Sequence, residues 1–78
     1  MQVHVRYFAV LRERKGCTNE TVVLPGPLTV GGLYASLFPP TEEGALPVMY
    51  AVNQSYVGSE HSLTEGDEVA FIPPLGGG

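Results

Sequence analysis

The C-terminal segment is where this chain could carry chemistry. Its last six residues are Pro73-Pro74-Leu75-Gly76-Gly77-Gly78. Two prolines keep the exit from the preceding strand extended, and three glycines lack the Cβ that would block entry into a narrow channel. The one chemical handle is the α-carboxylate of Gly78. Carboxylates are poor acyl donors, so we expect ATP to activate it as an acyl-adenylate, which a sulfur donor would convert to a thiocarboxylate.

A glycine-rich end also has an ordinary explanation. Glycines often end chains as frayed termini or as remnants of cloning. The glycines alone therefore leave the choice open, and a small globular domain ahead of them favours the functional interpretation.

Length and composition point to one small folded domain. The chain has 78 residues, of which 44% are hydrophobic and 15% charged, and eight acidic residues outnumber four basic ones to give a net charge of −4. A negative net charge argues against binding to nucleic acid and suits a partner with a basic groove. No apolar run approaches a membrane span, and no signal peptide is visible. Together with the single cysteine, Cys17, these features predict a cytoplasmic protein.

The pattern of apolar residues predicts an α+β fold. Val3, Val5 and Tyr7 alternate with His4, Arg6 and Phe8, and this period indicates a strand with one buried face. The expected strands are 2–8, 20–24, 47–52, 56–57 and 68–72, with a short helix at 9–15 and a main helix that runs to Phe38 after an N-cap at Thr29.

The first and last strands are far enough apart in the chain to pair in parallel at the centre of a mixed sheet. One main helix packed across such a sheet is the β-grasp, or ubiquitin-like, fold. We therefore expect a β-grasp domain at residues 1–74 and a flexible C-terminal glycine tail at residues 75–78.

Three blocks of the sequence resemble a known family. Residues 63–78 contain Gly-Asp-Glu-Val, then Pro-Pro and a terminal diglycine, residues 6–13 read Arg-Tyr-Phe-Ala-Val-Leu-Arg-Glu, and residues 51–57 contain Ala-Val-Asn-Gln followed by Tyr-Val. In this order they resemble the small subunit of molybdopterin synthase, a family of ubiquitin-like sulfur carriers. Gly76 departs from the pattern, because the family usually has Ser, Ala or Thr at this position.

The resemblance implies a cycle in which the carrier is a cosubstrate and the catalytic side chains belong to its partners. An adenylating enzyme would use ATP to activate Gly78, and a persulfide donor would supply the sulfur. The charged carrier would then dock into the synthase large subunit, in a heterotetramer, and donate sulfur for the dithiolene of molybdopterin. The resemblance implies no permanently bound cofactor for the carrier itself, and the spacing of the histidines gives no reason to expect a metal.

The resemblance also assigns roles to individual residues. Gly76 and Gly77 would thread into the partner, and the docking residues would be Phe8, Tyr56, Ile72, Pro73, Pro74 and Leu75. The alternation in the first strand supports Phe8 independently, because it places this residue on the face opposite Val3 and Val5.

Other interpretations stay open. The same tail chemistry would serve a carrier for thiamine thiazole synthesis or tRNA thiolation, a protein modifier would join Gly78 to a lysine, and a plain interaction domain would not need its glycines. His4 and His61 lack further ligands at metal-binding spacing, and Cys17 lacks an activating base. Asp67 and Glu68 are expected to be a turn residue and a solvated strand residue.

Overall fold

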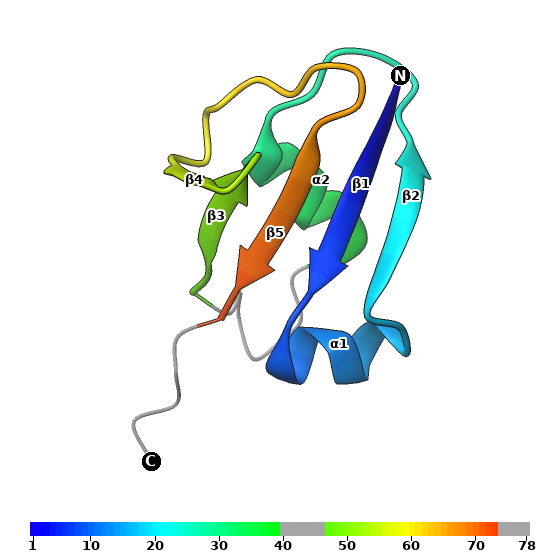
Figure 1. Ribbon diagram of the computed structural model, residues 1–78, viewed down its shortest axis with the longest axis vertical. Coiled ribbons are helices and arrows are strands. Elements are labelled where there is room, and N and C mark those ends of the chain that lie inside the picture. The colour runs from blue at the N-terminus through cyan, green and yellow to red at the C-terminus, as the bar shows by residue number, and fades with distance from the viewer. Residues whose placement is uncertain (40–46, 74–78) are drawn as a thin grey trace.

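Within residues 1–39 and 47–73, which the structure describes, the computed structural model contains five strands and two helices (Figure 1). In chain order these are β1 (Gln2–Tyr7), α1 (Ala9–Lys15), β2 (Asn19–Val23), α2 (Val30–Leu37), β3 (Met49–Val52), β4 (Ser55–Val57) and β5 (Glu68–Ile72). The order agrees with the one predicted from the sequence.

The strands form one mixed sheet in the order β2-β1-β5-β3-β4. The central pair, β1 and β5, is parallel, and the other three pairs are antiparallel. Figure 1 shows α2 lying across one face of this sheet, while none of the described helices or strands lies across the other face. The arrangement confirms the predicted β-grasp architecture.

The core lies between the sheet and α2. Val5 and Val69, which are partners in the β1–β5 register, are both fully buried, as are Tyr7 and Phe71 two positions further along. Leu33 and Tyr34 of α2 close the core from above the sheet. The alternation read from the sequence therefore assigns the buried face of β1 correctly.

The ends of several elements differ from the prediction by one or two residues. β1 ends at Tyr7 because Phe8 is the N-cap of α1, with an extended backbone. The third strand begins at Met49 rather than residue 47. Thr29 caps α2 as predicted, since its side-chain oxygen accepts a hydrogen bond from the Gly32 backbone at 3.0 Å.

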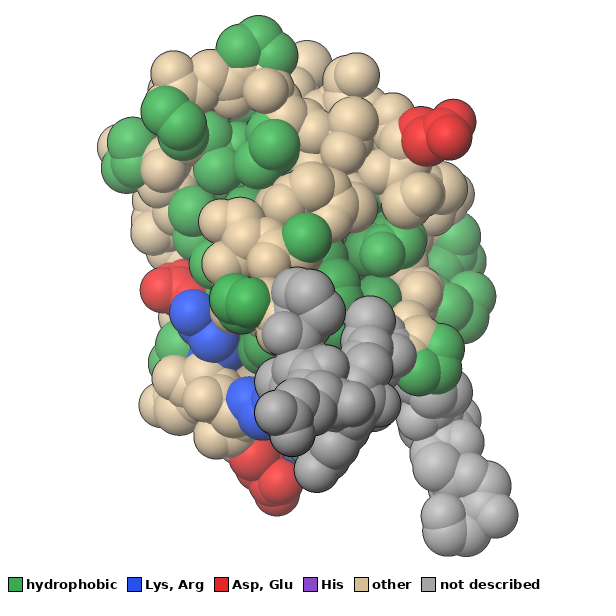
Figure 2. Space-filling model, turned by 180° about the vertical axis from the view of Figure 1, so that it is seen from behind, with side chains coloured by type: hydrophobic (Ala, Val, Ile, Leu, Met, Phe, Trp, Pro, Cys, Tyr) green, Lys and Arg blue, Asp and Glu red, His purple; other side chains and the backbone are tan. Residues whose placement is uncertain are grey.

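The helix-covered face carries few charges over its middle. Figure 2 shows that the Lys and Arg side chains visible on this face gather toward one end of the molecule, the end at which α1 lies in Figure 1. No helix among the described residues is long and apolar enough to cross a membrane.

A buried aspartate fastens the β3–β4 turn to the start of β5. Asp67 is 7% exposed and accepts hydrogen bonds from the Thr64 backbone at 2.8 Å, the Thr64 hydroxyl at 3.1 Å and the Asn53 carboxamide at 3.0 Å. The Asn53 carboxamide oxygen in turn accepts from the Glu68 backbone at 3.0 Å. We call Asn53, Thr64 and Asp67 the turn latch. Asp67 is a turn residue, as predicted from the sequence. Its burial was not predicted.

Hydrogen bonding makes the latch sensitive to acid. Burial acts to raise the pKa of Asp67, but the hydrogen bonds from Thr64 and Asn53 outweigh it, and the pKa lies below its ordinary value. A carboxyl group with a lowered pKa stabilises the fold above the pKa of the unfolded chain. This stabilisation disappears as the pH falls through the lower, folded value.

We predict that Asp67→Asn lowers the free energy of unfolding by about 1–3 kcal/mol at pH 7, because one of the two acceptor oxygens becomes an amide NH2 group that faces a hydrogen-bond donor. The difference from the unmodified chain should narrow as the pH falls below about 3.9, the ordinary pKa of aspartate. Urea unfolding measured across this range checks both statements. Glu60→Gln, at an exposed acidic residue, is the matched control. A deficit of the same size at every pH would contradict the account of the latch.

Candidate functional site

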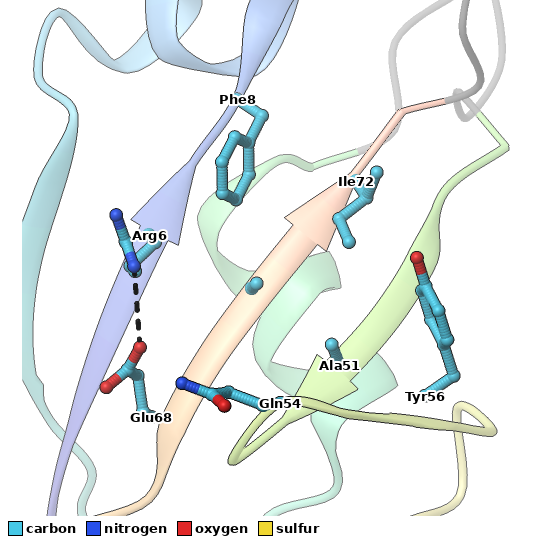
Figure 3. A pocket seen from close by; sticks show the side chains of 8 residues that line it. Arg6, Phe8, Ala51, Gln54, Tyr56, Glu68 and Ile72 are labelled. Carbon is cyan, nitrogen blue, oxygen red and sulfur yellow. Dashed lines mark ion pairs between the residues drawn. The ribbon is translucent and has the colours of Figure 1, made fainter.

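The uncovered face of the sheet carries a shallow hollow of about 230 Å³. Figure 3 shows side chains from β1, β5 and the β3–β4 hairpin around it. Its lining residues are Arg6, Phe8, Ala51, Gln54, Tyr56, Glu68, Ala70 and Ile72. The hollow therefore draws on both ends of the chain and on its middle.

Two small residues create the hollow. The strand register aligns Arg6 with Ala70, Ala70 with Ala51, and Ala51 with Tyr56, so these residues form one row across four strands. Neighbours in such a row place their side chains side by side on the same face. The two central positions hold methyl groups only, while larger side chains stand at the two ends. The alanines thus form a low floor between taller walls.

Three large apolar side chains stand around this floor. Phe8 is 40% exposed, Tyr56 is 68% exposed, and Ile72 is half-buried. Phe8 faces the open side because its extended backbone continues the alternation of β1. Ala9 follows with a φ of 50°, in the left-handed region, so the chain turns into α1 directly after Phe8. The structure therefore brings Phe8, Tyr56 and Ile72 together around one hollow, and their role in docking remains a prediction.

The remaining wall of the hollow is polar. Arg6 and Glu68 form an ion pair between β1 and β5 with a nitrogen–oxygen distance of 3.7 Å (Figure 3). The same guanidinium lies over the ring of Phe8, 5.9 Å from its centroid. Gln54 comes from the tight β3–β4 turn, where Asn53 and Gln54 both have positive φ angles of 51° and 71°.

The other predicted site residues fall into two groups. Pro73 is buried, so its ring is not part of the exposed surface of the free domain. Pro74, Leu75, Gly76, Gly77 and Gly78 lie outside the described residues. Their predicted roles in docking, threading and sulfur chemistry remain predictions.

Possible metal or redox groups are sparse in the part of the chain that the structure describes. No three His, Cys, Asp or Glu side chains gather there in a way that could hold a metal ion. Cys17 is half-buried against the core as a free thiol. Asp67 and Glu68 do not act together, because Asp67 belongs to the turn latch and Glu68 faces the hollow.

Comparison with known proteins identifies the family. Residues 5–78 match the model of the ThiS family, which is nearly the whole chain. The chain belongs to the ThiS family. The Escherichia coli molybdopterin synthase sulfur carrier subunit is 40% identical over 81 residues, an alignment that covers 97% of this chain and 99% of that protein. The resemblance seen in the sequence blocks is confirmed.

Solved structures of similar proteins share the fold. SAMP1 from Haloferax volcanii is 25% identical, with a TM-score of 0.78 and full coverage of both chains. A Helicobacter pylori protein–protein complex of subunits 1 and 2 of molybdopterin-converting factor contains a chain that is 25% identical, with a TM-score of 0.66 and full coverage of both chains. These similarities support the β-grasp fold independently of the strand order.

Sequence reasoning missed the polar half and the floor of the hollow. Arg6, Glu68 and Gln54 gave no sign of a shared site, since they are separated by many residues and ordinary in type. Ala51 and Ala70 gave an indirect sign, because small residues in strands that otherwise carry large ones leave space on the sheet. Only the strand register shows that the two alanines are neighbours.

We predict that Phe8 and Tyr56 contribute little to the stability of the domain. Because both side chains are substantially exposed, Phe8→Ala and Tyr56→Ala should each lower the free energy of unfolding by less than about 1 kcal/mol. Phe71→Ala, at a fully buried position on β5, should cost about 3–5 kcal/mol. Urea unfolding of the three variants checks this. A loss at Phe8 or Tyr56 as large as that at Phe71 would make these residues part of the core.

Proposed function

We propose that this chain is the sulfur carrier subunit of a molybdopterin synthase, and that it presents the hollow to the large subunit. The hollow carries the proposal, since exposed apolar side chains around a concave floor are typical of docking surfaces. β5 contributes Ala70 and Ile72 to the hollow and then leads into Pro73. A partner seated there would hold the strand from which the glycine tail continues.

The similarity to relatives supports the identity of this partner. The Escherichia coli relative is named for molybdopterin synthase, and the Helicobacter pylori structure is a complex of two subunits. The alignment covers 99% of the Escherichia coli relative and all of the Helicobacter pylori chain.

The proposed chemistry takes place at Gly78. The carboxylate attacks the α-phosphate of ATP on an adenylating enzyme, pyrophosphate leaves, and an acyl-adenylate forms. The terminal sulfur of a persulfide attacks the acyl carbon and displaces AMP. A second thiol of the donor cleaves the resulting sulfur–sulfur bond, which leaves a thiocarboxylate on Gly78 and a disulfide on the donor.

Sulfur delivery regenerates the carrier. In the large subunit the thiocarboxylate sulfur attacks a carbon of the pyranopterin precursor and breaks a carbon–oxygen bond there, and the displaced oxygen takes up a proton. Water then cleaves the bond between the sulfur and the acyl carbon. The sulfur stays on the precursor, and Gly78 returns to a carboxylate. Two thiocarboxylated carriers supply the two sulfurs of one dithiolene.

We predict that incubation with ATP, the adenylating enzyme and a persulfide donor raises the intact mass of the chain by the difference between sulfur and oxygen. Removal of Gly78 should abolish this gain. The enzyme's activity is established beforehand on a carrier known to be its substrate. No gain under these conditions would contradict the proposed sulfur chemistry.

Docking is tested separately. Phe8→Ala should weaken binding to the large subunit of the same organism by about tenfold or more, since a few large side chains carry most of the affinity of an interface. At high concentrations of the adenylating enzyme, the Phe8→Ala variant should still be converted to the thiocarboxylate at Gly78. Val23→Ala is the control, because Val23 is an exposed apolar residue on β2 that does not line the hollow. Equal losses for both variants would argue against a localised docking surface.

A protein modifier is the second candidate. SAMP1 has the same fold, and a solved structure of the Haloferax volcanii protein names it small archaeal modifier protein 1. A modifier would form an isopeptide bond between Gly78 and a lysine of a target. Isopeptide-linked conjugates of this chain that disappear on removal of Gly78, in cells that make no thiocarboxylate form, would favour the modifier over the carrier.

A further inference from the structure

The polar wall of the hollow contains Arg6, which among the described residues contacts Glu68 and the Phe8 ring but forms no side-chain hydrogen bond. The Arg6 side chain is 54% exposed, and its ion-pair partner Glu68 is 45% exposed. Their distance of 3.7 Å exceeds the 2.7–3.2 Å of an ordinary N–H···O hydrogen bond. The two side chains therefore compensate each other's charge without a hydrogen bond between these atoms.

Docking would remove water from the N–H donors of Arg6. A guanidinium carries five N–H donors, and exposed donors are satisfied by water. A partner that covers Phe8 and Ile72 would also cover Arg6, because the guanidinium lies over the Phe8 ring. Each donor buried without an acceptor costs free energy. The two oxygens of Glu68 are too few for five donors, so the partner has to supply acceptors of its own.

The shape of the hollow indicates which partner side chain lies next to these acceptors. Ala51 and Ala70 leave room for one apolar side chain between Tyr56 and Ile72, and Arg6 stands at the other end of the same row. A carboxylate suits the arginine best, since it matches the planar fork of a guanidinium with two parallel hydrogen bonds. Glu68 is itself a carboxylate, but its distance of 3.7 Å from Arg6 is longer than a hydrogen bond.

We propose that Arg6 is a specificity-determining residue of the docking surface and binds a carboxylate of the large subunit. An apolar side chain from the same segment of that subunit fills the floor of alanines. This inference rests on the proposed function, because it assumes the large subunit as the occupant of the hollow. It adds a charged contact to the apolar patch and selects against partners that present a cation at this position.

A purely intramolecular role is the alternative explanation for Arg6. It could simply hold Glu68 and the Phe8 ring in place, and a partner would then touch only apolar groups. A charge swap separates the two roles. Arg6→Glu combined with Glu68→Arg retains an ion pair between β1 and β5 but places a carboxylate where the partner's carboxylate would lie.

The experiment measures binding of the full-length carrier to the large subunit of the same organism by titration calorimetry at two salt concentrations. Arg6→Met should weaken binding by about ten- to hundredfold, the range expected for loss of charged hydrogen bonds. It should also reduce the dependence of the dissociation constant on salt. Glu68→Gln should not weaken binding, and the charge-swapped variant should stay at least as weak as Arg6→Met. Arg14→Met, at an exposed arginine of α1 outside the hollow, should bind like the unmodified chain.

Two results would overturn the inference while the proposed docking surface stands. One is full binding by Arg6→Met although Phe8→Ala binds weakly. The other is recovery of binding by the charge swap, which would assign Arg6 to the intramolecular role. Normal binding by Phe8→Ala would instead reject the docking surface itself, and this inference with it. Unfolding curves of each variant ensure that weak binding is not caused by loss of the fold.

Discussion

The parallel register between β1 and β5 determines most of what this domain presents to a partner. It joins two segments that are more than 60 residues apart in the sequence, since His4 is aligned with Glu68 and Tyr7 with Phe71. On the inner face the register pairs fully buried side chains and forms the centre of the core. On the outer face it brings Arg6 beside Ala70 and Glu68. The same pairing thus stabilises the fold and assembles the hollow.

The two faces of the sheet meet opposite packing requirements. The inner face is filled by Tyr7, Phe71 and the aromatic ring of Tyr34, whose centroid lies 5.2 Å from that of Phe71. The outer face keeps its centre low with two alanines and places its larger groups at the margins. Small domains gain limited stability from their cores, so a surface that leaves apolar groups uncovered has to be compensated elsewhere. The turn latch provides such a contribution with hydrogen bonds to a single carboxylate.

The latch also links stability to the proposed function. Asn53 is held by Asp67 and by the backbone of Glu68, and its neighbour Gln54 lines the hollow. Residues on both sides of the hollow are therefore positioned by hydrogen bonds at the end of the sheet where β5 begins. Preorganised surfaces lose less conformational entropy on binding, which raises their affinity for a partner.

The sequence predicted those features that depend on local patterns. Alternation in β1 placed Phe8 on the open face, turn residues located the β3–β4 hairpin, and Thr29 marked the start of α2. The ion pair of Arg6 with Glu68 could not be predicted, because it depends on the register between strands at the two ends of the chain. The burial of Asp67 was missed for a similar reason, since part of its hydrogen bonding comes from Asn53 in another turn.

Transfer of sulfur from a preloaded carrier is the most direct test of the central claim, that docking through the open face delivers the sulfur of Gly78. Thiocarboxylated chains, unmodified and Phe8→Ala, are mixed with excess large subunit and pyranopterin precursor, and the loss of the thiocarboxylate is followed by intact mass in a single turnover. The account predicts that Phe8→Ala needs about tenfold more large subunit to reach half its maximal rate, and that the maximal rate itself is unchanged. Identical dependence on the large subunit for both carriers, or no transfer from the unmodified chain, would contradict it.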